Sequence, residues 1–474
     1  MVAVDATPVL KKAITFSFSS TPTCPCDPHA VEGMATVEEQ VQAFRAWCSA
    51  CGITWHPAVQ IVAADDEGLG VFATADAWGC GGGGIEVGEA IISVPRRAAL
   101  SLSTHHAVAA TGAVLDQKHG LALAAALQPE PMQPWLALWP QETIGSWALD
   151  KDTWPAFGWN LELRALHEQQ EALARRAHER ISSVGEAGAA PTWSKYRWAM
   201  GIVSSRAADV VLNGERQPAL LPFIDMLNHR AYGLENSAIC FEPASASAPG
   251  ALDDDRLVVR CVRPVAPNEA VTICYGDKPN AALLHGYGFA VRPNPSDALL
   301  LRVPLGAPTD MIAMQRIAMI PSGLLDTTLA SGSEGGDQGA DQEGPVAKGT
   351  LSWDASGTAA CLSPELKMLL RAATASSIPE LFAALRTMAE EDEDEADEED
   401  EASELSPAAW KLLRDSVQAA LRALSAKRAS VEEDESPWPY WPHGAAAVAF
   451  EARRDLLTCA LKLAMEKVGS VGLE

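Results

Sequence analysis

The segment LLPFIDMLNHR, at residues 220–230, places polar side chains inside an apolar run. Asp225 stands among aliphatic and aromatic residues, and Asn228 and His229 follow side by side. Burying such groups without partners costs about 1–3 kcal/mol each, so aliphatic residues would serve folding alone better. Either the fold supplies hydrogen-bond partners for these side chains, or a ligand does.

Short strand patterns flank this segment on both sides. Residues 61–95 alternate β-like runs with glycine turns, and strand signals return in RLVVRCVRPV at 256–265 and AVTICYG at 270–276. This alternation of short strands and turns predicts a compact β structure rather than βαβ units.

Helical patterns fill the remaining chain. An Ala/Leu-rich stretch over about 105–195 predicts a helical insertion, and Leu/Ala-rich helices are expected after residue 347. Linker-like compositions at 331–347 and 390–404 indicate disordered segments. The insertion contains several tryptophans that we expect in its core rather than at a cofactor: Trp135, Trp139, Trp147, Trp154 and Trp159.

The cysteines of WCSAC, at 47–51, admit two functional interpretations. They resemble a redox CxxC pair or, together with Cys24 and Cys26, a four-thiolate zinc site. The surrounding pattern favours a structural role, because Thr36 and Glu39 form a capping-box sequence for a short helix. One helical stripe of this segment consists of Val37, Val41, Phe44, Cys48 and Cys51. We therefore expect no metal site.

The charge of the chain argues against nucleic acid as a partner. The formal net charge is −26, whereas binding to phosphates needs a concentrated basic face. Residues 390–404, EEDEDEADEEDEASE, hold 12 acidic residues, so without them the charge is −26 + 12 = −14. No apolar run reaches the roughly 20 residues that a membrane span requires.

Three spaced segments carry a recognisable pattern: DDEGLGVFA at 65–73, LLPFIDMLNH at 220–229 and VTICYGDKPNAALLHGYGF at 271–289. In this order they resemble the SET-domain protein methyltransferases, in the class of the Rubisco large-subunit lysine methyltransferase. That class opens with a GxG strand-turn near a glutamate and continues through an NH pair. It closes with a YG followed by N-x-x-LL-x-x-YGF.

The resemblance implies an α+β fold. In it, a helical insertion splits a SET domain of small β-sheets, and an all-α C-terminal domain follows. For this chain it predicts an N-terminal extension and helix over 1–56, a first SET part over 57–104, the insertion over 105–193, a second SET part over 194–294 and a helical substrate-binding domain over 295–474. Disordered insertions are expected in the last domain, at 331–350 and 390–404.

The resemblance also implies S-adenosyl-L-methionine as the cofactor. Asn228 would contact its amino acid end, for which an amide offers both donors and an acceptor, and His229 would lie near its adenine. Arg206 matches an arginine beside the methionine carboxylate, which a guanidinium can bind bidentately. The other implied cofactor contacts are Glu67, the backbone of Leu69, Tyr275 and Phe289.

Tyr275 and Tyr287 are the predicted catalytic residues. Methyl transfer is an in-line displacement, so an enzyme must align a neutral amine and exclude water. A tyrosine hydroxyl such as that of Tyr275 can orient the amine through weak hydrogen bonds. Tyr287 matches a second tyrosine of the lysine channel. Residues 235–259 lack a tyrosine that the Rubisco enzyme places there, which leaves the number of methyl groups open.

The resemblance thus implies a protein-lysine N-methyltransferase that acts on a non-histone protein, such as the Rubisco large subunit or another plastid or cytosolic protein. Two alternatives stay open: a protein-histidine methyltransferase and a catalytically silent binding module. In the histidine-methylating branch, an asparagine and a tryptophan occupy the positions of Ala208 and Ile224. We expect an intracellular monomer, in chloroplast or cytoplasm, with a lysine-presenting protein as its partner and without affinity for nucleic acid or membranes.

Overall fold

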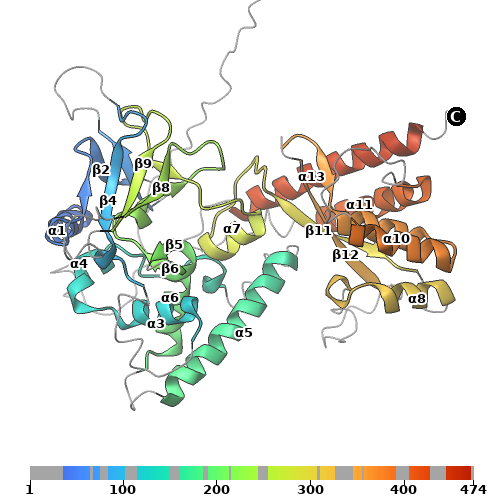
Figure 1. Cartoon of the computed structure of the whole chain (residues 1–474), viewed down its shortest axis with the longest axis horizontal. Helices are drawn as coiled ribbons and strands as arrows, with labels where there is room; N and C mark the ends of the chain where they lie inside the picture. Colours follow the sequence, from blue (N-terminus) through green and yellow to red (C-terminus); the bar gives the residue numbers. More distant parts are fainter. Residues whose placement is uncertain are drawn as a thin grey trace, which may run out of the picture.

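The computed structural model describes residues 36–64, 68–74, 84–101, 115–149, 161–184, 190–212, 215–243, 255–306, 310–325, 345–354, 357–390, 405–426 and 445–470. These residues form two lobes that meet near helix α7 and strand β11 (Figure 1). We call residues 36–297 the first lobe and residues 298–470 the C-terminal lobe. None of the described helices has an apolar stretch that is long enough to cross a membrane.

Helix α1, Val37–Ala50, begins the first lobe and confirms the predicted capping box. The Thr36 hydroxyl accepts from the backbone N–H of Glu39 at 3.2 Å, and the Glu39 carboxylate accepts from the backbone N–H of Thr36 at 2.7 Å. Phe44 and Cys48 are buried, whereas Val37 is exposed. The helix therefore packs on the core through the middle of its apolar stripe.

Small sheets make up the β structure of the first lobe. One sheet has four strands in the order β1-β4-β9-β8, and the pairs β2-β3, β5-β6 and β7-β10 form separate two-stranded sheets. Every pair is antiparallel except β7 with β10. The strands are β1 (Thr54–Trp55), β2 (Val59–Ala64), β3 (Gly68–Ala73), β4 (Ala90–Pro95), β5 (Ala207–Leu212), β6 (Glu215–Leu220), β7 (Asn228–His229), β8 (Ser237–Glu242), β9 (Arg256–Cys261) and β10 (Thr272–Ile273).

Helices are inserted between β4 and β5, where the sequence predicted them. They are α3 (Gln117–Leu127), α4 (Gln133–Leu136), α5 (Leu161–Val184) and α6 (Trp193–Arg206), with the short turns η1 (Arg96–Ala98), η2 (Glu130–Met132) and η3 (Gly145–Ala148). Trp135, Trp139 and Trp147 are buried, as expected for core residues. Trp154 and Trp159 lie outside the described residues.

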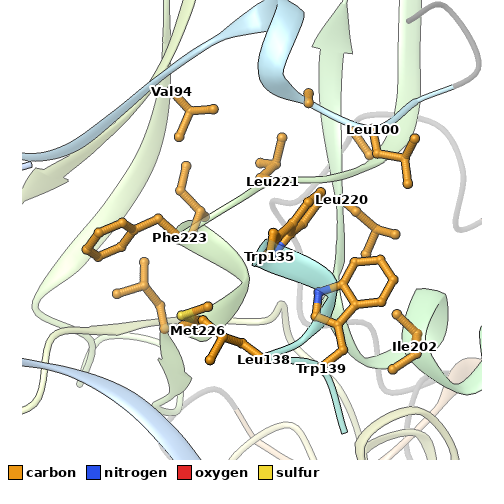
Figure 2. Packing of buried hydrophobic residues seen from close by; sticks show 14 of the residues in the cluster. Val94, Leu100, Trp135, Leu138, Trp139, Ile202, Leu220, Leu221, Phe223 and Met226 are labelled. Atoms are coloured by element: carbon orange, nitrogen blue, oxygen red, sulfur yellow. The ribbon is translucent and has the colours of Figure 1, made fainter. Parts of the chain in front are cut away.

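The chain leads from this insertion directly into the polar segment. Helix α6 continues into the hairpin β5-β6, the turn η5 (Ile224–Met226) and strand β7. Phe223 and Met226 belong to the same buried cluster as Trp135 and Trp139 (Figure 2), so the insertion and the polar segment share one core. Helix α7, Asn280–Tyr287, ends the first lobe.

The C-terminal lobe is not all-helical, which corrects one expectation within the confirmed α+β class. Strands β11 (Ala298–Pro304), β12 (Val346–Trp353) and β13 (Ala360–Leu362) form an antiparallel sheet. Its helical elements are α8 (Met311–Met319), η7 (Ser322–Leu324), α9 (Pro364–Thr374), α10 (Ile378–Glu390), α11 (Pro407–Ala426) and α13 (Ala445–Ser470).

The register of this sheet explains the strands. Leu299, Leu301 and Val303 alternate toward the core, as a half-buried strand requires. A Cβ at Gly349 would lie 2.7 Å from the Cα of Leu366, so glycine lets helix α9 approach β12 closely. Residues 346–350 belong to β12, although a disordered insertion was expected over 331–350. Residues 326–344 and 391–404 lie outside the described residues.

Candidate functional site

Two short parallel strands form the centre of the candidate site. Thr272 of β10 pairs with Asn228 of β7, and Ile273 pairs with His229. This pairing brings the Asn-His pair beside Tyr275, just after β10. The backbone N–H of Tyr275 donates to Nδ1 of His229 at 3.1 Å, across a sequence separation of 46 residues.

His229 is neutral at physiological pH. Its Nδ1 accepts a hydrogen bond and therefore carries no proton. Burial lowers the pKa of His229 to about 4, and the neighbouring Arg230 cation acts in the same direction. The imidazole is thus an uncharged ring with a fixed tautomer.

An aromatic cluster surrounds this imidazole. The ring centroid of His229 lies 5.1 Å from that of Tyr275 and 5.7 Å from that of Phe289. Tyr275 and Tyr287 stack with a centroid distance of 4.7 Å and an interplanar angle of 24°. Tyr287 ends helix α7, and Gly288, with a φ of 80°, turns the chain so that Phe289 joins the cluster.

The two tyrosine hydroxyls have different surroundings. The Tyr275 hydroxyl donates to the carbonyl of Leu227 at 2.7 Å, one residue before β7. Burial, with a smaller contribution from the Asp209 carboxylate, raises the pKa of Tyr287 to about 12. Tyr287 is therefore a neutral phenol at physiological pH, and the orientation of Tyr275 is fixed by its hydrogen bond.

Strand β3 approaches the Asn-His pair through a glycine. A Cβ on Gly70 would lie 2.8 Å from a ring carbon of Phe72 and 3.1 Å from Nδ2 of Asn228. The GLG sequence therefore lets the strand pass close to the asparagine amide. Leu69, which precedes this glycine, is partly buried against the core. Glu67 lies outside the described residues.

The fold supplies partners for Asp225, whose carboxylate is fully buried. Its Oδ2 accepts from the indole N–H of Trp135 at 3.0 Å and from that of Trp139 at 3.1 Å. Burial raises the pKa of Asp225, whereas Arg206 and the two indoles oppose that rise. Among the described residues, no hydrogen-bond partner reaches its Oδ1.

Arg206, the last residue of α6, is anchored to the same segment. Its Nη1 donates to the backbone carbonyl of Asp225 at 2.9 Å and lies 3.6 Å from Oδ2 of that residue. The structure thus brings His229, Tyr275, Tyr287 and Phe289 into one cluster of rings, and it ties Arg206 to the turn before Asn228.

Asn280, the first residue of the N-x-x-LL-x-x-YGF motif, supports the site through contacts that the sequence analysis did not predict. Its backbone and side-chain N–H groups each donate to a different carboxylate oxygen of Asp297, both at 2.8 Å. Its Oδ1 accepts from the backbone N–H of Val291 at 2.9 Å. These bonds close the loop that carries Phe289 and so hold its ring in the cluster. The signal in the sequence was an asparagine at the start of an apolar helix.

A second missed group lies behind α7. The Oγ of Ser146 lies 2.9 Å from Nδ1 of His167 and 2.6 Å from Nδ1 of His285, which precedes Tyr287 by two residues. Burial lowers the pKa of His285 to about 3 and also lowers that of His167. A Cβ on Gly145 would lie 2.4 Å from the carbonyl oxygen of His285. This close contact fastens the insertion to α7.

The cysteines of α1 have the character of core residues. Burial raises the pKa of Cys48 and of Cys51, so both thiols are protonated at neutral pH. Cys24 and Cys26 lie outside the described residues. In the part of the chain that the structure describes, no group of three or more His, Cys, Asp or Glu side chains is arranged to hold a metal ion.

Comparisons with known proteins place the fold. No protein-family model matches the sequence. The ribosomal lysine N-methyltransferase set10 of Schizosaccharomyces pombe (strain 972 / ATCC 24843) is 31% identical over 146 residues, which cover 29% of this chain and 23% of the yeast protein. The similarity to this curated relative therefore spans less than a quarter of its length.

Solved structures match over more of the chain. The SET domain of LSMT bound to methyllysine and AdoHcy has a TM-score of 0.59 and 18% identity, over 90% of this chain and 92% of that one. Rubisco LSMT bound to sinefungin and monomethyllysine has a TM-score of 0.59 and 19% identity over the same shares. This chain therefore has the SET-domain fold of the LSMT structures, which confirms the fold predicted from its motifs.

Proposed function

We propose that this protein is an S-adenosyl-L-methionine-dependent protein-lysine N-methyltransferase with a non-histone protein substrate. The meeting of His229, Tyr275, Tyr287 and Phe289 beside the β7-β10 pair carries the proposal. Structures of the same fold hold AdoMet, AdoHcy or sinefungin, and lysine or methyllysine. The relative set10, named as a ribosomal lysine methyltransferase, supports the same reaction class.

The residues present fit this cofactor. Gly70 lets strand β3 pass close to Asn228, where a Cβ would lie 3.1 Å from the asparagine Nδ2, so no side chain at this position covers the amide. In our proposal, Asn228 and Arg206 hold the amino acid end, because an amide and a guanidinium suit an ammonium and a carboxylate. The neutral ring of His229 and the ring of Phe289 flank the adenine. The backbone of Leu69 and the side chain of Glu67 complete the proposed contacts.

When bound, the cofactor supplies a methyl group on a sulfonium centre, and an amine displaces the sulfur in line. The role of Tyr275 follows from its hydrogen bond to Leu227: its proton is engaged, so its oxygen acts as an acceptor for an amine N–H. The uncharged ring of Tyr287 stacks on the ring of Tyr275. These rings exclude water and disfavour a charged lysine, which must lose its proton before it reacts.

Two positions favour lysine over histidine as the acceptor. Ala208 lies in β5, and Ile224 is buried in η5, and neither side chain can form a hydrogen bond. An imidazole acceptor needs a polar partner on its second nitrogen to fix its tautomer. A lysine stem needs only apolar walls along its methylene groups. We therefore assign the ε-nitrogen of lysine as the methyl acceptor.

The decisive experiment labels the substrate. The purified full chain, incubated with isotopically labelled S-adenosylmethionine and host lysate, should label a protein on a lysine ε-nitrogen, which tandem mass spectrometry locates. Replacing that lysine by arginine should abolish the label. A label on histidine would overturn the lysine assignment and leave the cofactor assignment standing. Failure of the folded wild type to bind the cofactor in calorimetry would favour a silent binding module.

Substitution Tyr275→Phe should retain the fold and the cofactor affinity but lower turnover by roughly 10²-fold, because one positioned hydroxyl is removed. Steady-state turnover and calorimetry measure the two effects. Tyr196→Phe is the matched control, since that hydroxyl donates to the carbonyl of His119 at 3.3 Å, in the buried core. Turnover of Tyr275→Phe within about twofold of wild type would move the catalytic role elsewhere.

Substitution Asn228→Ala should weaken cofactor binding by about 1–3 kcal/mol, because it removes the donor and acceptor of a partly buried amide. Calorimetry on the folded variant measures this loss, and thermal unfolding checks that the fold is intact. Unchanged affinity would show that the amide of Asn228 does not contact the cofactor.

A further inference from the structure

Two indoles converge on one buried carboxylate oxygen. Trp135 and Trp139 both donate to Oδ2 of Asp225, at 3.0 and 3.1 Å, and their rings meet edge to face with centroids 5.0 Å apart. Figure 2 shows both rings in one cluster with Leu220, which ends strand β6, and Leu221, the next residue of the polar segment. Both donors come from the insertion, about 90 residues before the carboxylate.

The same oxygen faces a guanidinium. Arg206 lies 3.6 Å from Oδ2 of Asp225, and its Nη1 also donates to the Asp225 backbone carbonyl. A desolvated ion pair holds its geometry only when further hydrogen bonds satisfy the charged groups. The two indole N–H groups provide those bonds. The position of Arg206 therefore depends on where the indoles hold the carboxylate.

Helix α1 supports this arrangement from the other side. Trp47 stacks on Trp135 with centroids 6.2 Å apart, and its indole N–H donates to the carbonyl of Pro131 at 2.6 Å. The Asp225 carboxylate also acts on Cys48 of α1: burial, Cys51 and this carboxylate raise the pKa of the Cys48 thiol, which is therefore neutral. Among the described residues, the charged or titratable groups that interact with this carboxylate are Arg206 from α6 and Cys48 from α1.

We propose that Trp135 and Trp139 are positioning residues of the cofactor site: they hold the Asp225 carboxylate, which orients Arg206 toward the carboxylate of a bound ligand. The inference rests on the proposed function for the identity of that ligand. It gives the helical insertion a part in cofactor binding, although neither indole needs to touch the cofactor.

A change of Trp139 to Phe removes one donor and keeps an aromatic ring in the core. Without this donor the pKa of Asp225 rises further, because burial is then opposed by fewer hydrogen bonds. Protonated Asp225 no longer attracts Arg206. The loss of cofactor affinity that accompanies acidification should therefore occur at higher pH in the variant than in wild type.

The test measures calorimetric affinity for S-adenosylmethionine and for methylthioadenosine, which lacks the amino acid carboxylate, between pH 5 and pH 8. At pH 7, Trp135→Phe and Trp139→Phe should each bind S-adenosylmethionine about tenfold more weakly, with unchanged affinity for methylthioadenosine. The matched control is Trp198→Phe, because that indole donates to the carbonyl of Pro140 at 2.9 Å. This control should bind both ligands as wild type does.

Wild-type affinity and pH dependence in both tryptophan variants would overturn the proposal. Equal losses for the two ligands would also overturn it, since they would indicate general damage to the site. If a tryptophan variant fails to fold, Asp225→Asn provides the test. Its affinity for S-adenosylmethionine should be lower than that of wild type and should no longer fall on acidification. Wild-type affinity with the wild-type pH dependence would show that the carboxylate does not orient Arg206.

A failure of the proposed function would look different. Wild type would then bind neither ligand, and the assignment of the indoles to a cofactor site would fall with it. The coupling of Trp139 to Asp225 remains measurable by thermal unfolding. The melting temperature of Trp139→Phe should approach that of wild type as the pH falls, because protonation removes the buried charge, whereas the deficit of Trp198→Phe should stay constant.

Discussion

The cores of the two lobes are built from different side chains. In the first lobe, large aromatic residues fill the centre, and several of their N–H groups bond to other elements: Trp135, Trp139, Trp147 and Trp198. The C-terminal lobe is filled mainly by leucine and alanine. Its buried Arg316 donates to the carbonyls of Leu305 and Ala375, at 2.9 and 2.6 Å, and so joins loops rather than forming a site.

This difference shows what each core has to do. An indole combines a large apolar surface with one directional donor, so it can hold a polar group at a fixed place inside a core. An aliphatic side chain fills volume and orients nothing polar. Changes at the two indoles that hold Asp225 should therefore alter cofactor binding, whereas changes in the aliphatic core of the C-terminal lobe should alter only stability.

The broadest effect, on both stability and cofactor binding, is expected from Gly145→Ala in the first lobe. Its φ is 61°, and a Cβ would lie 2.4 Å from the carbonyl oxygen of His285, so strain and overlap combine. We expect a loss of about 2–4 kcal/mol in unfolding free energy, together with weaker cofactor binding as α7 shifts. Gly233→Ala is the control, because its φ is 79° but no atom lies within 4 Å. Equal effects of both changes would contradict the role of this contact.

Leu413→Ala in α11 tests whether the aliphatic core of the C-terminal lobe affects stability alone. The side chain is fully buried in the aliphatic core, so its truncation should cost about 2–5 kcal/mol of stability. Denaturant unfolding measures this cost. The fraction that remains folded should bind the cofactor with wild-type affinity, and a tenfold loss in that fraction would show that the C-terminal core does orient the site.

The first lobe should also be the more sensitive to acid. The pKa of His285 is lowered to about 3 and that of His229 to about 4, below the unfolded value near 6.5. The unfolded chain therefore binds these protons first, so stability is lost as the pH falls from 6.5 toward 4. His285→Gln should reduce the slope of melting temperature against pH by about a third, as His167 and His229 still contribute. An unchanged slope would show that His285 does not contribute to the acid sensitivity of the protein.

The smallest effect is expected from deletion of residues 390–404. This expectation comes from composition, because a run of like charges cannot bury apolar surface. Melting temperature and turnover on a short peptide should stay nearly unchanged. A salt-dependent fall in the association rate with a basic protein substrate would indicate electrostatic steering. A large fall in melting temperature would show that the segment contributes to a core.

Local signals predicted the fold best where they do not depend on distant contacts. The capping box of Thr36 and Glu39 was visible in the sequence, and so was the apolar face of α1. The sequence ALLLRVP at 298–304 did not indicate whether this segment forms a strand or a helix, because a short apolar run fits a strand or a buried helix equally well. Its partner strand, Val346–Trp353, lies more than 40 residues away.

The candidate site shows the same limit. Spaced motifs predicted His229, Tyr275, Tyr287 and Phe289, which the fold brings together. They did not predict the partners of those residues, since Ser146 meets His285 across 139 positions. A carboxylate at Asp225, inside an apolar run, did indicate that hydrogen-bond donors must lie nearby. The donors are tryptophans of the insertion, and no sequence periodicity relates residues that lie about 90 positions apart.

The parallel pair of β7 and β10 has a consequence for folding during synthesis on the ribosome. Among the described strands, β7 pairs with β10 alone, so Asn228 and His229 lack a sheet partner until residues 272 and 273 have left the ribosome. The aromatic cluster is complete only after Phe289 has also been synthesised. The nascent chain therefore cannot complete its site before residues 272–289 have been synthesised, and such non-local pairings are the kind that form slowly. Truncated chains that end before β10 cannot carry the site on their own.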